Sequence, residues 1–167
     1  RLLQAAALEP LLTEVLHAAL DLTGATLGAV ELAAPDGAGT TVAVQVGFGG
    51  PGTTDEAATP GNAAARRFDR EASSMPAPAV GAGVLGLRTT LRLGLDDGTP
   101  SPLPLAAEVQ SRLRAAGIRM MQCAPLLGTA GRPLGAICVY WRTRARDSET
   151  RRVLFDLLAR QASELLE

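Results

Sequence analysis

The chain has 167 residues, a length at which a single domain buries roughly two-thirds of the surface exposed by its unfolded form. Hydrophobic residues make up 47% of the sequence but aromatic residues only 3%, so the core must be built mainly from aliphatic side chains. The net charge is -1 with no long run of either sign, which argues against a nucleic-acid-binding face. We find neither a signal peptide nor an apolar run long enough to span a bilayer, so we expect a cytoplasmic fragment without membrane insertion.

The N-terminal segment predicts a helix. Residues 2–23 carry apolar side chains at helical spacing, and Gly24 is placed to end the helix. Pro10 interrupts this run. Because proline is tolerated in the first turn of a helix but not in its interior, we expect the packed helix to begin near Glu9. Residues 1–8 would then be a helical lead-in from an upstream module.

The next segment predicts a β-hairpin and then a long irregular region. Apolar runs at 26–34 and 40–48 flank a Pro-Asp-Gly turn, which is typical of two paired strands. Glycine and proline are dense over residues 49–104, where the sequence leaves room for a short helix at 62–73 and a strand at 85–95. Loops of this length usually carry function.

The last third predicts a helix, two strands and a closing helix. Residues 104–117 predict a helix that ends at Gly117, and strands at 118–127 and 133–142 follow around a turn. Both strands are apolar on both faces, so we expect them inside the sheet with cover on each side. The closing helix has an apolar stripe that runs over 153–166.

This order of elements indicates one α+β domain over residues 1–167. Strands joined by hairpins run antiparallel, and helices then gather on the faces of the sheet. We expect the two terminal helices on one face and the irregular segment on the other.

Residues 115–167 carry a specific resemblance. A strand ends in the dipeptide Pro125-Leu126, a turn contains Gly131, the next strand has Gly135 before hydrophobic residues, and the closing helix follows the pattern Leu-x-x-Leu-Ala-x-Gln-Ala. This pattern resembles the GAF domains of bacterial signalling proteins. The matching residues are Gly117, Arg119, Gln122, Pro125, Leu126, Gly131, Gly135, Leu154, Leu157, Leu158, Ala159, Gln161 and Ala162. The N-terminal helix and hairpin agree in order, and the middle of the chain is not covered.

The resemblance implies a six-stranded antiparallel sheet of the GAF and PAS type, with a small-molecule pocket on one face and terminal helices that often pair between subunits on the other. Such domains sense or dimerise rather than catalyse, and commonly precede an output module such as a histidine kinase or a cyclase. We therefore expect a sensory module without enzymatic activity, working as a homodimer. The expected dimer residues are Leu154, Leu158, Gln161 and Leu165. A purely structural dimerisation domain with an empty pocket is the alternative.

The ligand cannot be identified from the sequence, and no cofactor is expected. His17 is the only histidine and lies on the first helix, which does not indicate a metal or haem site. No Cys-His pair supports bilin attachment, and a hydrolase triad or a phosphate-binding loop lacks its residues. The candidate pocket residues are Phe48, Arg92, Met121 and Cys123.

The two cysteines form a candidate redox pair. If Ala130 and Gly131 make a two-residue turn, counting back along both strands places Cys123 opposite Cys138 on one face of the sheet. A turn one residue longer would put them on opposite faces. Opposed thiols could form a redox-responsive bond, but buried free cysteines are also common core residues, and both interpretations stay open.

Overall fold

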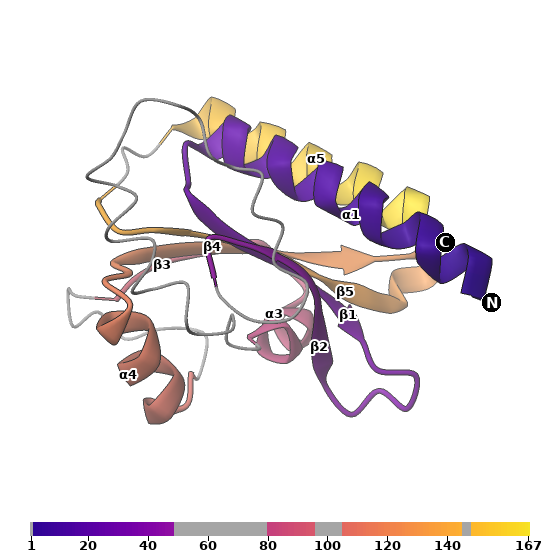
Figure 1. Cartoon of the computed structure of the whole chain (residues 1–167), viewed down its shortest axis with the longest axis horizontal. Coiled ribbons are helices and arrows are strands. Elements are labelled where there is room, and N and C mark those ends of the chain that lie inside the picture. The colour runs from indigo at the N-terminus through magenta and orange to yellow at the C-terminus, as the bar shows by residue number, and fades with distance from the viewer. Residues whose placement is uncertain (1, 49–79, 96–104, 145–147) are drawn as a thin grey trace.

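The computed structural model describes residues 2–48, 80–95, 105–144 and 148–167 (Figure 1). Within these residues the helices are α1 (Leu2–Thr23), α3 (Gly81–Leu87), α4 (Ala107–Ala115) and α5 (Glu149–Leu166). The strands are β1 (Leu27–Ala33), β2 (Thr40–Val46), β3 (Leu91–Gly94), β4 (Met120–Leu127) and β5 (Pro133–Trp141). A 3₁₀ turn, Thr129–Gly131, joins β4 to β5. The short helix expected at 62–73 lies outside the described residues.

The five strands form one antiparallel sheet in the order β2-β1-β5-β4-β3. β5 and β4 are inner strands, which confirms the expectation drawn from their two apolar faces. The expectation of six strands is wrong for the described part of the chain, which holds five. Residues 135–140 of β5 pair with a strand on each side, so their backbone polar groups are satisfied within the sheet.

The strand expected at 85–95 is only partly present. Its first residues belong to the helix α3, and the strand itself is short, at Leu91–Gly94. Arg88 adopts a left-handed conformation with φ of 57°, and its N–H donates to the carbonyl of Val84, which ends the helix. The chain can therefore turn from helix to strand within three residues.

The first helix is continuous through Pro10, so the expected start near Glu9 is wrong for the helix itself. Pro10 and Ala6 are both exposed, so the carbonyl that loses its helical partner can be hydrated. The buried face of α1 nevertheless begins with Leu12, close to the predicted position, and half-buried Leu8 packs beside it. The packed part of α1 thus starts close to where the sequence predicts, although the helix itself begins earlier, at Leu2.

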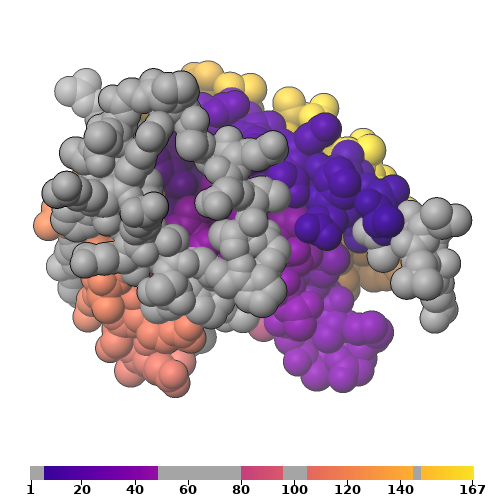
Figure 2. Space-filling model, viewed as in Figure 1, coloured from indigo at the N-terminus to yellow at the C-terminus, as the bar shows by residue number. Residues whose placement is uncertain are grey.

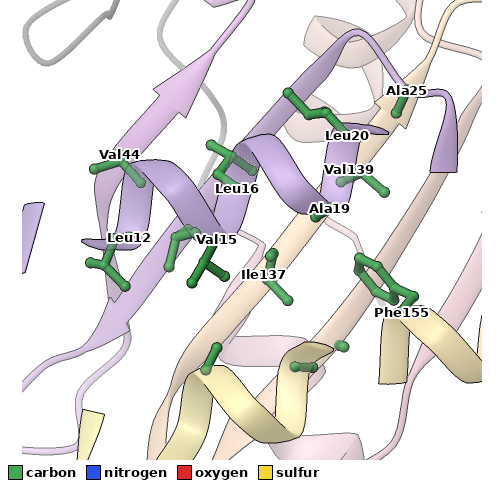
Figure 3. Packing of buried hydrophobic residues seen from close by; sticks show 14 of the residues in the cluster. Leu12, Val15, Leu16, Ala19, Leu20, Ala25, Val44, Ile137, Val139 and Phe155 are labelled. Atoms are coloured by element: carbon green, nitrogen blue, oxygen red, sulfur yellow. The ribbon is translucent and has the colours of Figure 1, made fainter. Parts of the chain in front are cut away.

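Two layers cover the sheet. α1 and α5 lie side by side on one face (Figure 1), and in Figure 2 they run together along one edge of the molecule, away from α4. They pack on what we call the terminal-helix cluster, part of which is shown in Figure 3: Leu12, Val15, Leu16, Ala19, Leu20, Val44, Ile137, Val139 and Phe155. α3 and α4 contribute to the opposite layer.

The turn between β4 and β5 is one residue longer than predicted. The N–H of Gly128 donates to the carbonyl of Arg132, so three residues form the turn and Leu127 pairs with Pro133. A register shift between Leu126 and Leu127 restores the predicted pairing, because Leu134 is left as an extra residue on β5. The bulge cancels the effect of the longer turn.

β1 and β5 approach each other so closely at Gly135 that a side chain has no space there. A Cβ there would lie 3.1 Å from the carbonyl carbon of Glu31 and 3.2 Å from Cα of Leu32, and closer still to the Glu31 carbonyl oxygen. Backbone paired on both sides cannot easily yield, so we expect Gly135→Ala to destabilise the fold by about 1–3 kcal/mol in denaturant unfolding. Gly86→Ala, which meets nothing within 4 Å, is the control and should be neutral or stabilising. Equal stability of the two variants would contradict the close approach.

Candidate functional site

The sheet face opposite the terminal helices is a second apolar layer, which we call the α3-side cluster. Its buried members come from all the inner strands, from α3 and from the segments around α4. They are Leu27, Ala29, Phe48, Val80, Val84, Leu93, Leu95, Leu113, Ile118, Met121, Cys123, Ala136, Cys138 and Tyr140. Among the described residues this cluster holds two aromatic rings, Phe48 and Tyr140, which meet edge to face with centroids 5.4 Å apart.

Three of the four predicted pocket residues meet in this cluster. Phe48, Met121 and Cys123 are all buried there. Arg92 lies on the opposite face, because Leu93 points into the α3-side cluster and neighbouring residues of a strand alternate. The Arg92 guanidinium lies over the Trp141 ring, 5.2 Å from its centroid. Arg92 therefore lies on the sheet face covered by the terminal helices, and the other three residues lie on the opposite face.

Tyr140 brings an unusual polar group into this apolar layer. Its side chain is fully buried, and its hydroxyl has no hydrogen-bond partner of ordinary geometry among the described residues. Burial raises the pKa of Tyr140 far above its usual range, and the nearby Cys138 adds to the shift. The hydroxyl therefore stays neutral within this layer.

Glu31 is a fully buried carboxylate on β1. Its side chain accepts hydrogen bonds from the Val80 N–H at 2.8 Å, from the Gly81 N–H, and from the Thr40 hydroxyl at 3.1 Å. These contacts fix the start of α3 to the sheet, and we call this group of residues the Glu31 latch. Burial raises the pKa of Glu31, while the hydrogen bonds lower it by a smaller amount.

The other end of α3 is held as well. The Arg88 guanidinium donates to the Gly131 carbonyl in the β4–β5 turn at 2.9 Å, and the Thr90 hydroxyl donates to Asp156 on α5. The same turn contacts the end of α5, because the Thr129 hydroxyl donates to the Glu167 carboxylate at 2.7 Å. The segment that follows α3 therefore contacts both the β4–β5 turn and α5.

The outward face of α5 carries a stripe of apolar side chains among polar ones such as Arg160 and Glu164, and this stripe covers nothing within the described residues. The helix buries Phe155, Ala159, Ala162 and Ser163, whereas Val153, Leu154, Leu157 and Leu165 are exposed. Beside its first turn lies an open hollow of about 330 Å³, lined by Glu149, Thr150, Val153 and Leu154.

Of the predicted dimer residues, Leu154, Gln161 and Leu165 are exposed on α5, and Leu158 packs partly against the terminal-helix cluster.

Sequence reasoning missed Glu31, and it left Val153 and Leu157 of the predicted stripe out of the dimer residues. Glu31 is the single charge in the otherwise apolar strand TLGAVELAA, at a position that alternation places on the same face as Leu27 and Ala29, and this signal could have been used. Val153 and Leu157 also belong to the exposed stripe. His17 is half-buried on α1, remote in the fold from the α3-side cluster. The described residues contain no grouping of three or more His, Cys, Asp or Glu side chains suited to a metal ion.

The raised pKa of Glu31 gives stability a defined pH dependence. Because the folded-state pKa lies above that of the unfolded chain, the folded protein keeps a proton that the unfolded chain releases first. The contribution to stability is greatest below the unfolded pKa of about 4.3 and falls as the pH rises through the folded pKa. In a series of urea titrations, the wild-type protein should therefore lose stability relative to Glu31→Gln as the pH rises from the unfolded-state pKa through the folded-state pKa. A stability difference that does not change with pH would contradict the assignment.

None of the helices in the described ranges has the length and apolar character needed to cross a membrane.

Comparison with known proteins identifies the family. A search of curated proteins finds no match. Among solved structures, a GAF domain/HD domain protein from Geobacter sulfurreducens matches with 17% identity, a TM-score of 0.65, and coverage of 99% of this chain and 95% of that chain.

Two further solved structures show the same fold. A domain assigned to a two-component sensor histidine kinase of Sinorhizobium meliloti 1021 has 15% identity, a TM-score of 0.61, and coverage of 95% of this chain and 89% of that one. The phycocyanobilin-bound GAF domain of a cyanobacterial phytochrome has 15% identity and a TM-score of 0.61, with coverage of 95% and 84%. The GAF domain family model matches residues 5–167, and the chain therefore belongs to the GAF domain family.

Proposed function

We propose that this chain is the sensory and dimerisation module of a bacterial cytoplasmic signalling protein. GAF domains are sensory modules that bind small molecules or chromophores, and they are regulatory rather than catalytic. In our proposal a small molecule or partner binds at the α3-side cluster, and the terminal helices transmit the resulting conformational change. The observation that carries the proposal is that α5, besides burying one face against the sheet, exposes four large aliphatic side chains.

The two faces of α5 support a homodimer. One face is needed to cover the sheet, and a helix that only covers its own sheet is usually polar on the other side. Here Leu154, Leu157 and Leu165 follow one another at intervals of three and eight residues, which keeps them on one stripe of the helix. Val153 widens this stripe. A second copy of α5 would remove these side chains from water, which is favourable in proportion to the apolar area buried.

The contacts of α3 supply a route from the α3-side cluster to α5. A ligand that displaces α3 would disturb the Arg88 contact with Gly131 and the Thr90 contact with Asp156. The turn that carries Gly131 also carries Thr129, whose backbone and side-chain donors hold the pKa of Glu167 below its usual range. The two states of α3 would then correspond to two positions of the end of α5. A covalently linked output module, such as a kinase or cyclase, would read that position.

A purely structural dimerisation domain is the second candidate. It is favoured by one observation: the described residues of the α3-side cluster are buried and include only two aromatic side chains, whereas small-molecule pockets usually have aromatic walls. The two candidates differ in their response to ligands and agree in their use of α5.

The dimer surface predicts the effect of one exposed substitution. Leu157 is 42% exposed, so Leu157→Gln should change the unfolding free energy of the monomer by less than about 0.5 kcal/mol. It should raise the dimer dissociation constant at least about tenfold, because a central leucine is lost from the interface. Sedimentation equilibrium measures this constant. Glu108→Gln, at an exposed position of α4 on the other side of the sheet, is the control and should leave it unchanged. Unchanged association of Leu157→Gln would exclude this surface.

Thermal unfolding in the presence of nucleotides, haem, bilins and small acids distinguishes the two candidate functions. A molecule bound to the folded state stabilises it by about 2.7 kcal/mol at a hundred times its dissociation constant. We expect one of these classes to raise the melting temperature of the wild type, and Tyr140→Phe to reduce that rise while leaving the free domain no less stable. A response to none of them would favour the purely structural domain.

A further inference from the structure

Cys123 and Cys138 are directly opposed on neighbouring strands, and the hydrogen-bond pattern defines the type of pair. The Leu95 N–H donates to the Arg119 carbonyl at 2.8 Å. Hydrogen-bonded pairs alternate along an antiparallel ladder, so the pair formed by Leu91 and Cys123 is also hydrogen-bonded. The backbone N–H and C=O of Cys123 therefore face β3.

It follows that the pair of Cys123 with Cys138, on the other side of β4, is not hydrogen-bonded. In such pairs the Cα atoms lie about 4.5 Å apart and the side chains are closest. A disulfide spans Cα separations of about 4.4–6.8 Å, so the pair has a spacing that a bond can bridge without moving the strands. Both cysteines are free thiols, and both side chains point into the α3-side cluster.

The thiols are shielded by the helix that the Glu31 latch holds. Cys123 is 1% exposed and Cys138 is fully buried. Val80 and Val84, at the start and in the middle of α3, belong to the same cluster, and α3 packs on both β4 and β5. Burial, followed by the neighbouring Cys123, raises the pKa of Cys138 well above its usual range, which keeps the nucleophilic thiolate scarce. Oxidation is therefore slow while α3 is in place.

We propose that Cys123 and Cys138 form a reversible cross-strand disulfide, and that the Glu31 latch controls when an oxidant reaches them. The oxidant belongs to the class of small-molecule disulfides. One cysteine loses its proton to solvent and attacks a sulfur of the oxidant, which releases one small thiol after proton uptake. The second cysteine then attacks the mixed disulfide, the bond between the two cysteines forms, and a second small thiol leaves. The protein loses two hydrogens, and the oxidant is reduced to two thiols.

Two substitutions within α3 test the role of the latch. In Gly81→Ala the new Cβ would meet the Glu31 carboxylate, with Oγ of Thr40 only 3.1 Å away, so the carboxylate must leave the start of α3. Gly86→Ala adds the same methyl group to the same helix where nothing lies within 4 Å. Each folded protein is incubated with oxidised glutathione and then alkylated under denaturing conditions. Mass spectrometry reports the fraction in which both thiols are protected and two hydrogens are lost.

We expect Gly81→Ala to form the disulfide about tenfold faster than wild type, the factor expected for losing one buried charge-assisted hydrogen bond. Gly86→Ala should react at the wild-type rate or more slowly. Thr40→Val, which removes one donor to Glu31, should show a smaller acceleration and provides the test if Gly81→Ala does not fold. Equal rates in wild type and in the latch variants would overturn the gating.

Two controls separate the latch from other causes of oxidation. Ala162→Gly weakens α5 on the opposite face of the sheet, so an equal acceleration there would show that global unfolding, and not release of α3, exposes the thiols. Cys138→Ala should give only a mixed disulfide with glutathione. If the wild type also ends as mixed disulfides on single cysteines, no cross-strand bond forms and the proposal fails.

Discussion

The fold depends on a pair of inner strands that are buried on both faces. β4 and β5 place alternate side chains into two separate apolar clusters. Their backbone groups form hydrogen bonds with each other and with β3 and β1 on the outer sides. A strand of this kind is stable only when a layer of helices covers each side. The terminal helices provide one layer, and α3 with the segments around α4 contributes to the other. The positions of the thiols, of Tyr140 and of the exposed stripe on α5 all follow from this arrangement.

The strands and the terminal helices could be predicted because their apolar patterns are long and continuous. α3 could not, because the stretch GAGVLGL contains three glycines and carries no helical periodicity. This helix is defined by tertiary contacts, with Glu31 at its start and Arg88 at its end. The pairing of Cys123 with Cys138 was predicted from a two-residue turn that does not exist. The longer turn and the bulge at Leu134 compensate each other, and sequence counting cannot detect such a compensation.

The candidate site was partly predictable for the same reason. Met121 and Cys123 share a face because they are two residues apart on a strand of known register, and this needs only alternation. The sheet face on which Arg92 lies depends on the register of a four-residue edge strand, and the sequence does not define that register. The hydrogen-bond partners of Glu31 could not be predicted, because they lie at the start of a helix about fifty residues later in the chain.

The sizes of the side chains around α5 limit how this helix can move. Apart from Phe155, the side chains that α5 buries are small, namely Ala159, Ala162 and Ser163, whereas its exposed ones include three leucines and a valine besides charged residues. Turning the helix by half a revolution would push leucines into spaces shaped for alanine, and dense interiors resist such overpacking. A half-turn of α5 about its own axis is therefore unfavourable, and the relay proposed above would instead use a sliding or tilting motion of this helix.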